Sequence, residues 1–140
     1  MMFKNIENIK YTKPHSYKKK HLTFRITRLH QGHYGILVLN SMFLQVGILE
    51  TLRRFLVRLL LRKGVIWFRN LSFYGMTAKA VGTRMGGGKG AIKNWGVYVP
   101  GGSVFIEFTG PKLLNTKNQL KPLFSLIKGN CILIKRPSLK

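Results

Sequence analysis

The sequence predicts an α+β fold in which a largely antiparallel, mixed sheet is covered by two helices. One long stretch has the apolar spacing of a helix, several short apolar runs are typical of strands, and two of those runs flank a Pro-Gly-Gly turn. Helical and strand-like stretches follow one another in mixed order, which favours this architecture. With 140 residues, of which 45% are hydrophobic, the chain is long enough for one folded domain.

The clearest expected element is a helix over residues 44–63. Its apolar residues recur at steps of three and four, at Ile48, Leu49, Leu52, Phe55, Leu56, Leu59 and Leu60. A second face carries Glu50, Arg54, Arg58 and Arg62 at steps of four, with Arg53 alongside. We expect Glu50 to pair with Arg54, because residues four apart are neighbours on a helix. Gly64 is expected to end the helix.

Shorter elements are expected on both sides of this helix. A strand-like run precedes it at residues 36–39, and a buried strand with Arg69 projecting follows it at residues 65–71. Residues 72–75 are expected to turn the chain, and residues 78–83 are expected to extend again.

The last third of the chain predicts a hairpin, a second helix and a final strand. Residues 95–99 and 103–108 flank the Pro-Gly-Gly turn, which is typical of a hairpin. Residues 113–127 have helical spacing, although Pro122 should interrupt or kink that helix. Residues 131–134 are expected to add a short strand.

The chain is predicted to have an arm, a domain and a tail. Residues 1–33, with eight Lys or Arg and all four His, are expected to form an extended basic N-terminal arm. Residues 34–136 would form the α+β domain, and residues 137–140 a basic tail. Aromatic residues among the arm's cations are typical of segments that stack on bases. The alternative for the arm is a solvated tail, because charge runs usually repel themselves.

The charge of the chain points to a polyanionic partner. It has 25 Lys or Arg against three acidic residues, Glu7, Glu50 and Glu107, for a formal net charge of +22. Such an excess repels itself in the compact state. Nucleic acid supplies compensating charge at high density, with one negative charge per about 1.7 Å of duplex. Nucleic-acid binding is therefore the first hypothesis.

The composition argues against most enzymes and against a metal or cofactor. With no Asp and three scattered Glu, the chain lacks groups for paired-carboxylate hydrolysis, two-metal phosphoryl transfer or an Asp-oriented triad. Its lone cysteine, Cys131, cannot form an internal disulfide or a cysteine-rich zinc site. His30 and His33 have no carboxylate or cysteine nearby to complete a metal shell.

No membrane insertion and no import signal are expected. The uncharged run at residues 33–49 is shorter and more polar than the roughly 18–20 apolar residues of a spanning helix. The first ten residues lack the apolar core of a signal peptide and the Arg-rich, Ser-rich character of an import sequence. We therefore expect a protein that works in the compartment where it is made.

The sharpest local motif is a glycine-rich loop. It consists of Arg84, Met85, Gly86, Gly87, Gly88, Lys89 and Gly90. A Walker loop is excluded, because Gly90 stands where that motif requires Ser or Thr. A dinucleotide fingerprint fits the spacing but would have to open a helix, and the predicted hairpin follows instead. The remaining interpretations are a loop whose backbone approaches nucleic acid beside Arg84, Lys89 and Lys93, or a plain turn.

Together these motifs resemble ribosomal protein sixteen of the large subunit, in the universal uL-sixteen family. The resemblance covers residues 34–136. It is carried by the loop at 84–90, by Trp95, Gly102 and Glu107 after it, and upstream by Tyr34-Gly35, Arg53, Arg54, Arg58, Gly64 and the Ile66-Trp67-x-Arg69 strand. Residues 17–21 resemble the basic arm of that family.

The resemblance implies a structural constituent of the large ribosomal subunit that helps to organise the A-site tRNA region near the peptidyl transferase centre. With the pattern of cations, it predicts rRNA contacts at Lys18, Lys19, Lys20, His21, Arg25, Arg28, Arg53, Arg54, Arg58, Arg69 and Lys93. The loop at 84–90 would face the tRNA sites. Expected partners are large-subunit rRNA, tRNA at or near the A site, and neighbouring large-subunit proteins. The alternative is an RNA-binding assembly factor that leaves the mature ribosome.

Departures from the family pattern bear on the compartment. Gln45 replaces a capping Thr, Gly87 replaces a lysine of the loop, and the segment between His21 and Tyr34 is shorter. The chain has three Ala against eight Asn, a bias expected of an AT-rich organellar genome. We therefore expect a mitochondrial protein, with a plastid as the second choice and a bacterium as the third.

Overall fold

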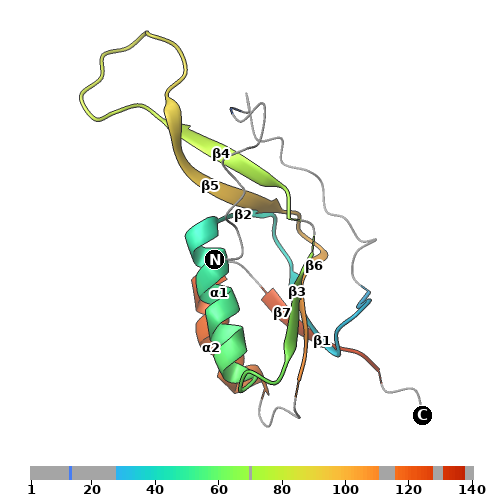
Figure 1. Ribbon diagram of the computed structural model, residues 1–140. Helices are drawn as coiled ribbons and strands as arrows, with labels where there is room; N and C mark the ends of the chain where they lie inside the picture. Colours follow the sequence, from blue (N-terminus) through green and yellow to red (C-terminus); the bar gives the residue numbers. More distant parts are fainter. Residues whose placement is uncertain (1–12, 14–27, 70, 111–115, 128–130, 138–140) are drawn as a thin grey trace.

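The computed structural model shows an α+β arrangement, which confirms the predicted fold class (Figure 1). It describes residues 13, 28–69, 71–110, 116–127 and 131–137. Two antiparallel sheets and two helices lie within these residues. None of the helices described is long and apolar enough to cross a membrane.

The larger sheet has four strands in the order β3-β6-β1-β7. These strands are β1 (Tyr34–Val38), β3 (Val65–Phe68), β6 (Ser103–Thr109) and β7 (Cys131–Lys135). Strand β6 lies between β1 and β3, and all its residues but the last are buried. A strand flanked on both sides and buried on both faces is the natural centre of the core.

The smaller sheet has three strands in the order β2-β5-β4. They are β2 (Met42–Gln45), β4 (Phe73–Ala78) and β5 (Ala91–Val99). Strands β4 and β5 form a long hairpin that extends away from the rest of the molecule and ends in the loop of residues 79–90 (Figure 1).

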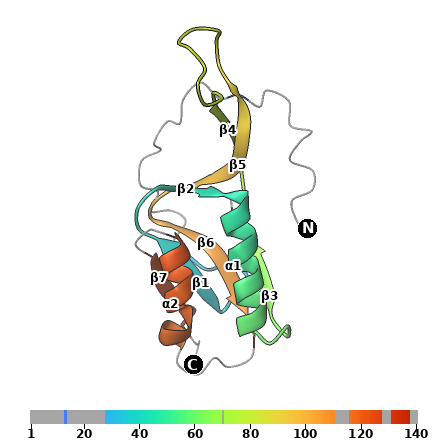
Figure 2. The same ribbon diagram turned by 90° about the vertical axis from the view of Figure 1, so that its left-hand side faces the viewer.

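Two helices cover the larger sheet side by side (Figure 2). Helix α1 (Val46–Leu59) buries Leu49, Leu52 and Leu56, and helix α2 (Thr116–Ile127) buries Leu120, Leu123 and Ile127. These side chains meet Ile36, Val38, Phe105 and Phe108 in one core. The apolar face that the sequence predicts for α1 is therefore the face that packs.

Helix α1 is shorter at both ends than the predicted helix of residues 44–63. Leu44 belongs to β2, and Gln45 caps α1 with extended backbone and no side-chain hydrogen bond to the helix. The helix ends at Leu59, and Leu60 is its C-cap. It cannot continue, because the two residues after the cap, Leu61 and Arg62, have φ values of 52° and 60°. Gly64 is therefore not the stop that the sequence predicted.

The predicted turn at 72–75 and extended run at 78–83 are also wrong. Residues 73–78 form β4, and residues 79–90 form the loop. The error came from Gly75, which indicates a turn in the sequence but lies buried in the strand, paired with Trp95 of β5.

The predicted hairpin of residues 95–99 and 103–108 is wrong in its pairing. Both strands exist, but β5 pairs with β2 and β4, whereas β6 pairs with β1 and β3. The intervening turn passes the chain from one sheet to the other. It is held by the Ser41 hydroxyl, which accepts from the Gly101 N–H at 3.1 Å, and by the Val38 carbonyl, which accepts from the Gly102 N–H at 2.7 Å.

Of the interruption or kink predicted at Pro122, the interruption does not occur. The helix runs through it from Thr116 to Ile127, while the predicted start at 113–115 lies outside the described residues. Proline removes the backbone bond to the residue four positions earlier, here Asn118. Both residues are exposed, so water can satisfy that carbonyl.

A buried carboxylate joins the centre of the larger sheet to the segment before β1. Glu107 of β6 is 1% exposed. Its oxygens accept bonds from three consecutive backbone N–H groups, those of His30, Gln31 and Gly32, at 3.1, 2.8 and 2.8 Å. The Arg69 guanidinium lies 2.8 Å from the same carboxylate. A Cβ at Gly32 would come within 2.8 Å of the Phe108 nitrogen, so glycine permits this close approach.

The environment of Glu107 keeps it ionised. Burial raises its pKa, but the backbone donors at Gly32, Gln31 and His30 and the charge of Arg69 together lower that pKa below its usual 4.5. A carboxyl whose pKa is lower in the folded state contributes stability above the unfolded pKa, and this contribution is lost as the pH falls through the folded pKa.

Replacing this carboxylate should therefore destabilise the whole domain. In Glu107→Gln an amide NH₂ would face N–H donors, and Arg69 would lose its counter-charge. We expect a loss of about 3 kcal/mol in the free energy of unfolding at neutral pH, measured by urea denaturation. The stability that the wild type loses on acidification below pH 4.5 should be missing from the variant.

The matched control is Glu50→Gln, which removes the helix-surface carboxylate. Its cost should be about 0.2–0.5 kcal/mol per lost pair. Equal destabilisation by the two variants would contradict the role assigned to Glu107.

Candidate nucleic-acid interface

In the described part of the chain, both acidic side chains form ion pairs with arginines and have little exposed surface. The Glu50 side chain is 13% exposed and pairs with Arg53 and Arg54, while Glu107 pairs with Arg69. Glu7 lies outside the described residues. The exposed charges among the residues described are therefore cations, and they have no exposed carboxylate to compensate them.

The pairing on α1 is wider than predicted. Arg54 Nε lies 3.2 Å from Glu50, which confirms the expected pair, but Arg53 makes the closer contact through Nε at 3.0 Å and Nη2 at 2.7 Å. These hydrogen bonds, with that of Arg53 contributing most, lower the pKa of Glu50 to about 2. Two hydrogen bonds to the Glu50 carboxylate therefore hold the Arg53 guanidinium in one orientation.

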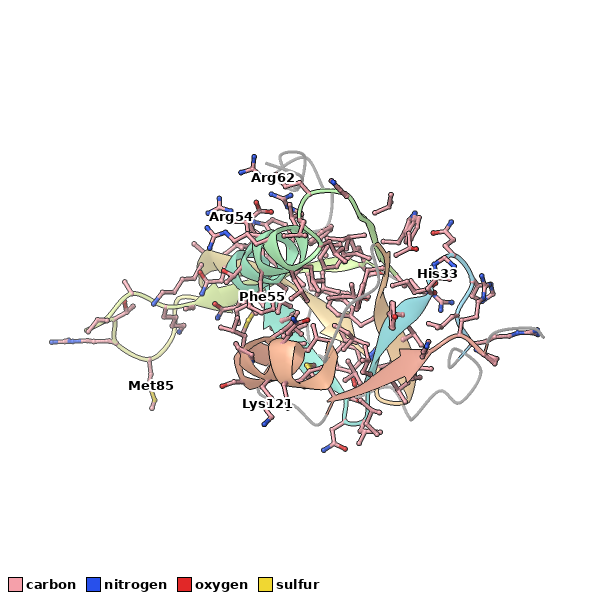
Figure 3. The ribbon with its side chains drawn as sticks, turned by 90° about the horizontal axis from the view of Figure 1, so that it is seen from below. His33, Arg54, Phe55, Arg62, Met85 and Lys121 are labelled. Carbon is pink, nitrogen blue, oxygen red and sulfur yellow. The ribbon has the colours of Figure 1, made fainter. Side chains whose placement is uncertain are left out.

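The outer face of α1 presents Arg54 and Arg58 to solvent, and Arg62 lies in the turn that follows the helix, not on the helix face predicted for it. The side chain of Arg54 is 63% exposed, and Arg58 and Arg62 are exposed as well. Arg54 and Arg62 point outward on the same side of the molecule, and Lys121 of α2 lies on another side (Figure 3). We call Arg54, Arg58 and Arg62 the α1 stripe. Each arginine has a planar guanidinium whose N–H donors can bind two oxygens of one phosphate group.

The glycine-rich loop lies at the far end of the β4–β5 hairpin. Residues 79–89 are all exposed, and Met85 projects fully into solvent (Figure 3). Gly86, Gly87 and Gly88 have φ values of 101°, 69° and 75°, with open space where a Cβ would stand. Glycine is therefore favoured at these positions by the positive φ values of the loop backbone, and not by close packing against other atoms. Lys79 Nζ donates to the Gly86 carbonyl at 2.5 Å across the loop.

The surroundings of the loop exclude the dinucleotide interpretation. Strand β5 begins at Ala91, directly after the loop, so no helix opens there. Among the described residues, no group of three His, Cys or carboxylate side chains could hold a metal ion. Cys131 is half-buried in β7, and this burial raises the pKa of its thiol to about 11.

The structure places the other predicted contact residues unevenly. Arg28 and Lys93 are exposed. Arg69 is 19% exposed, because its Nη1 binds Glu107 and donates to the Arg28 carbonyl at 2.9 Å. The predicted arm contacts Lys18, Lys19, Lys20, His21 and Arg25 lie outside the described residues.

Sequence reasoning missed how residues 28–33 are held against the larger sheet. Besides the Glu107 contacts, Arg136 after β7 donates through Nη2 to the His30 carbonyl at 2.9 Å and through its backbone N–H to the His33 carbonyl at 2.8 Å. The available signal was a single Glu inside the apolar run of residues 103–108. A lone acid in a buried strand needs donors, and its backbone donors lie more than 70 residues away in the chain.

Comparison with known proteins agrees with this geometry. A family model described as ribosomal protein L16p/L10e matches residues 6–128. The large ribosomal subunit protein uL16c of Cyanidium caldarium is 36% identical over 112 residues, which cover 80% of each chain. The uL16 protein of Buchnera aphidicola subsp. Baizongia pistaciae is 33% identical over 74% of this chain and 76% of its own. That of Mesoplasma florum is 28% identical over 91% and 93%.

These matches confirm the resemblance seen in the glycine-rich loop, the α1 arginines and the Arg69 strand. The model match spans most of the sequence, and the relatives align over most of their own lengths. The chain therefore belongs to the ribosomal protein L16p/L10e family.

Proposed function

We propose that this chain is a structural constituent of the large ribosomal subunit and binds large-subunit rRNA during translation. Family membership supports this function, because the similar proteins are named as large ribosomal subunit proteins. The observation that carries it is the engagement of Glu50 and Glu107 by arginines, which leaves the described surface with uncompensated cations. The family is one of structural proteins, so the chain is not an enzyme.

The contact surfaces follow from the exposed cations. The α1 stripe, Lys93 and Arg28 would meet rRNA phosphates, as would Lys18, Lys19, Lys20, His21 and Arg25 of the arm. Arg53 and Arg69 would contribute less charge, because each already neutralises a carboxylate. Neighbouring large-subunit proteins would cover other parts of the surface.

The loop at 84–90 would face tRNA at or near the A site, close to the peptidyl transferase centre. Its position at the end of a projecting hairpin supports this assignment, because a loop there can reach beyond the domain's own rRNA contacts (Figure 1). Open space around Gly86, Gly87 and Gly88 lets the backbone itself approach a nucleic-acid strand.

The chain works in the ribosome of an organelle or a bacterium, since the similar proteins are of the uL16c and bacterial uL16 kinds. Within that range we propose a mitochondrion. The scarcity of Ala and the abundance of Asn support this choice. A plastid and a bacterial cytoplasm are the alternatives.

Charge removal on the α1 stripe should weaken rRNA binding. In Arg54→Gln with Arg58→Gln, two phosphate contacts are lost. We expect lower affinity for the large-subunit rRNA of the source, and a plot of log affinity against log salt that is flatter by about one unit per lost contact. Filter binding over a salt series measures both.

The matched control for the stripe is Lys121→Gln, which removes an exposed cation from α2, away from the stripe (Figure 3). Its salt slope should stay at the wild-type value. An unchanged slope in the double arginine variant would show that the stripe is an ordinary solvated face.

Neutralising the loop should impair function without affecting the fold. Arg84→Ala with Lys89→Ala changes two exposed side chains on a projecting loop, so the Tm should stay at the wild-type value. Ribosomes carrying the variant should translate more slowly or mature late, as measured by polysome profiles and peptide synthesis. Loss of folding would instead make the loop a structural element.

A salt wash separates a constituent of the ribosome from an assembly factor. Purified large subunits of the source, washed at high salt, should keep the chain in a stoichiometric amount. Quantitative mass spectrometry against other large-subunit proteins measures the ratio. If the chain is absent from washed subunits but present on immature particles, it is an assembly factor.

A further inference from the structure

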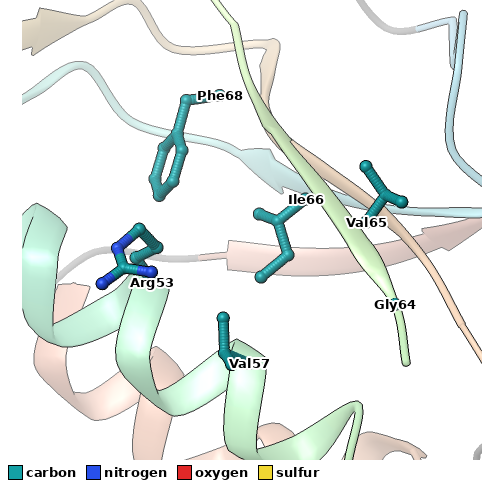
Figure 4. Close-up of a pocket in the computed structure, with 6 residues that line it drawn as sticks. All are labelled: Arg53, Val57, Gly64, Val65, Ile66 and Phe68. Atoms are coloured by element: carbon teal, nitrogen blue, oxygen red, sulfur yellow. The ribbon is translucent and has the colours of Figure 1, made fainter. Parts of the chain in front are cut away.

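A small cavity opens between α1 and β3, directly beside the α1 stripe. Its volume is about 260 Å³, and it is lined by Arg53, Val57, Gly64, Val65, Ile66 and Phe68. Figure 4 shows Arg53 and Val57 reaching into this space from α1, and Ile66 and Phe68 reaching into it from β3. None of the functions proposed above uses this cavity.

The size and lining of the cavity suit one flat ring system. Its walls are aliphatic and aromatic, and among the described residues Arg53 is the one charged residue that lines it. The volume lies below the roughly 300–1,000 Å³ of pockets that hold drug-sized ligands. A complete cofactor is therefore too large for the cavity. A nucleobase is small enough to fit, because it is a single planar ring system, and its apolar face suits the apolar walls.

Arg53 presents a fixed plane at the edge of this space. Its Nε and Nη2 both bind Glu50, which holds the guanidinium in place, and its side chain remains 31% exposed. Among the described residues, Nη1 has no hydrogen-bond partner. Guanidinium planes stack on nucleobases, and their remaining N–H groups can bind the base edge. A fixed plane loses less entropy on stacking than a free arginine would.

The charges around the cavity favour RNA as the occupant. Arg54 and Arg58 are the chain neighbours of Arg53 and Val57, and Lys63 precedes Gly64; all three cations are exposed. The nearby carboxylate of Glu50 is already neutralised. A strand whose phosphates lie on these cations would carry its bases past the opening. An aliphatic side chain of a neighbouring protein would fill the apolar space without using this cationic rim.

We propose that the cavity receives one unpaired nucleobase of the rRNA. The base enters between Val57 and Ile66, stacks against the Arg53 guanidinium, and leaves its flanking phosphates on Arg54 and Arg58. This inference depends on the proposed rRNA binding. It adds a site that recognises an extruded base to a surface that otherwise contacts the backbone.

Methyl NMR of the full chain tests this directly. The protein, labelled at its Val and Ile methyl groups, is titrated with a short oligoadenylate and with an abasic strand of the same length. We expect upfield ring-current shifts of the Val57 and Ile66 methyls with oligoadenylate and none with the abasic strand. Both strands should perturb the arginine side-chain signals of the α1 stripe.

A cavity-filling variant supplies the second measurement. Val57→Phe occupies the space without changing charge, and it should weaken oligoadenylate binding about ten-fold, the scale of one lost base stack. Binding of the abasic strand should not change. The control is Ser125→Phe, which places the same ring on the exposed face of α2, outside the cavity lining and away from the α1 stripe, and should leave both affinities at wild-type values.

The outcomes separate this inference from the proposed function. If both strands bind and the cavity methyls stay unshifted, base docking is wrong while RNA binding stands. If neither strand nor the rRNA of the source binds, the proposed function fails and the inference fails with it. If adenosine monophosphate shifts these methyls at lower concentration than oligoadenylate, the site takes a free nucleotide and an rRNA base is excluded.

Discussion

The buried carboxylate of Glu107 is the interaction on which the rest of the structure depends. It places a negative charge at the centre of the larger sheet, where an unpaired charge would be costly. Three backbone N–H groups of residues 30–32 and the Arg69 guanidinium remove that cost. In return, one side chain holds the end of the N-terminal segment, the central strand and the residue following β3 in a fixed arrangement.

Arginines have two roles in this chain: some pair with its own carboxylates and stabilise the fold, and others expose positive charge to solvent. Arg53 and Arg69 act inward, on Glu50 and Glu107, while the α1 stripe faces solvent. The net charge of +22 already includes the three acidic residues, and the two described ones pair internally, so they do not cover the outward-facing cations. Self-repulsion is then relieved by a polyanion, which is the role of rRNA in the function proposed here.

Local patterns were enough to predict the fold class, the packed face of α1 and the Glu50–Arg54 pair, because all of these depend on residues a few positions apart. Strand pairing was not predictable in this way. Strands β5 and β6 look like a hairpin, but β5 pairs with β2 and β4, and β6 pairs with β1 and β3. Gly75 looks like a turn but lies in β4. The partners of Glu107 and the cavity between α1 and β3 likewise depend on long-range contacts.

The central claim is that internally neutralised acids leave a cationic face for large-subunit rRNA. A density map of the large ribosomal subunit from the chain's own source tests it most directly. We expect one copy of the chain per subunit, with Arg54 and Arg58 against rRNA phosphates and Glu107 still bound to residues 30–32. A subunit that lacks the chain, or one in which the α1 stripe faces solvent, would contradict it.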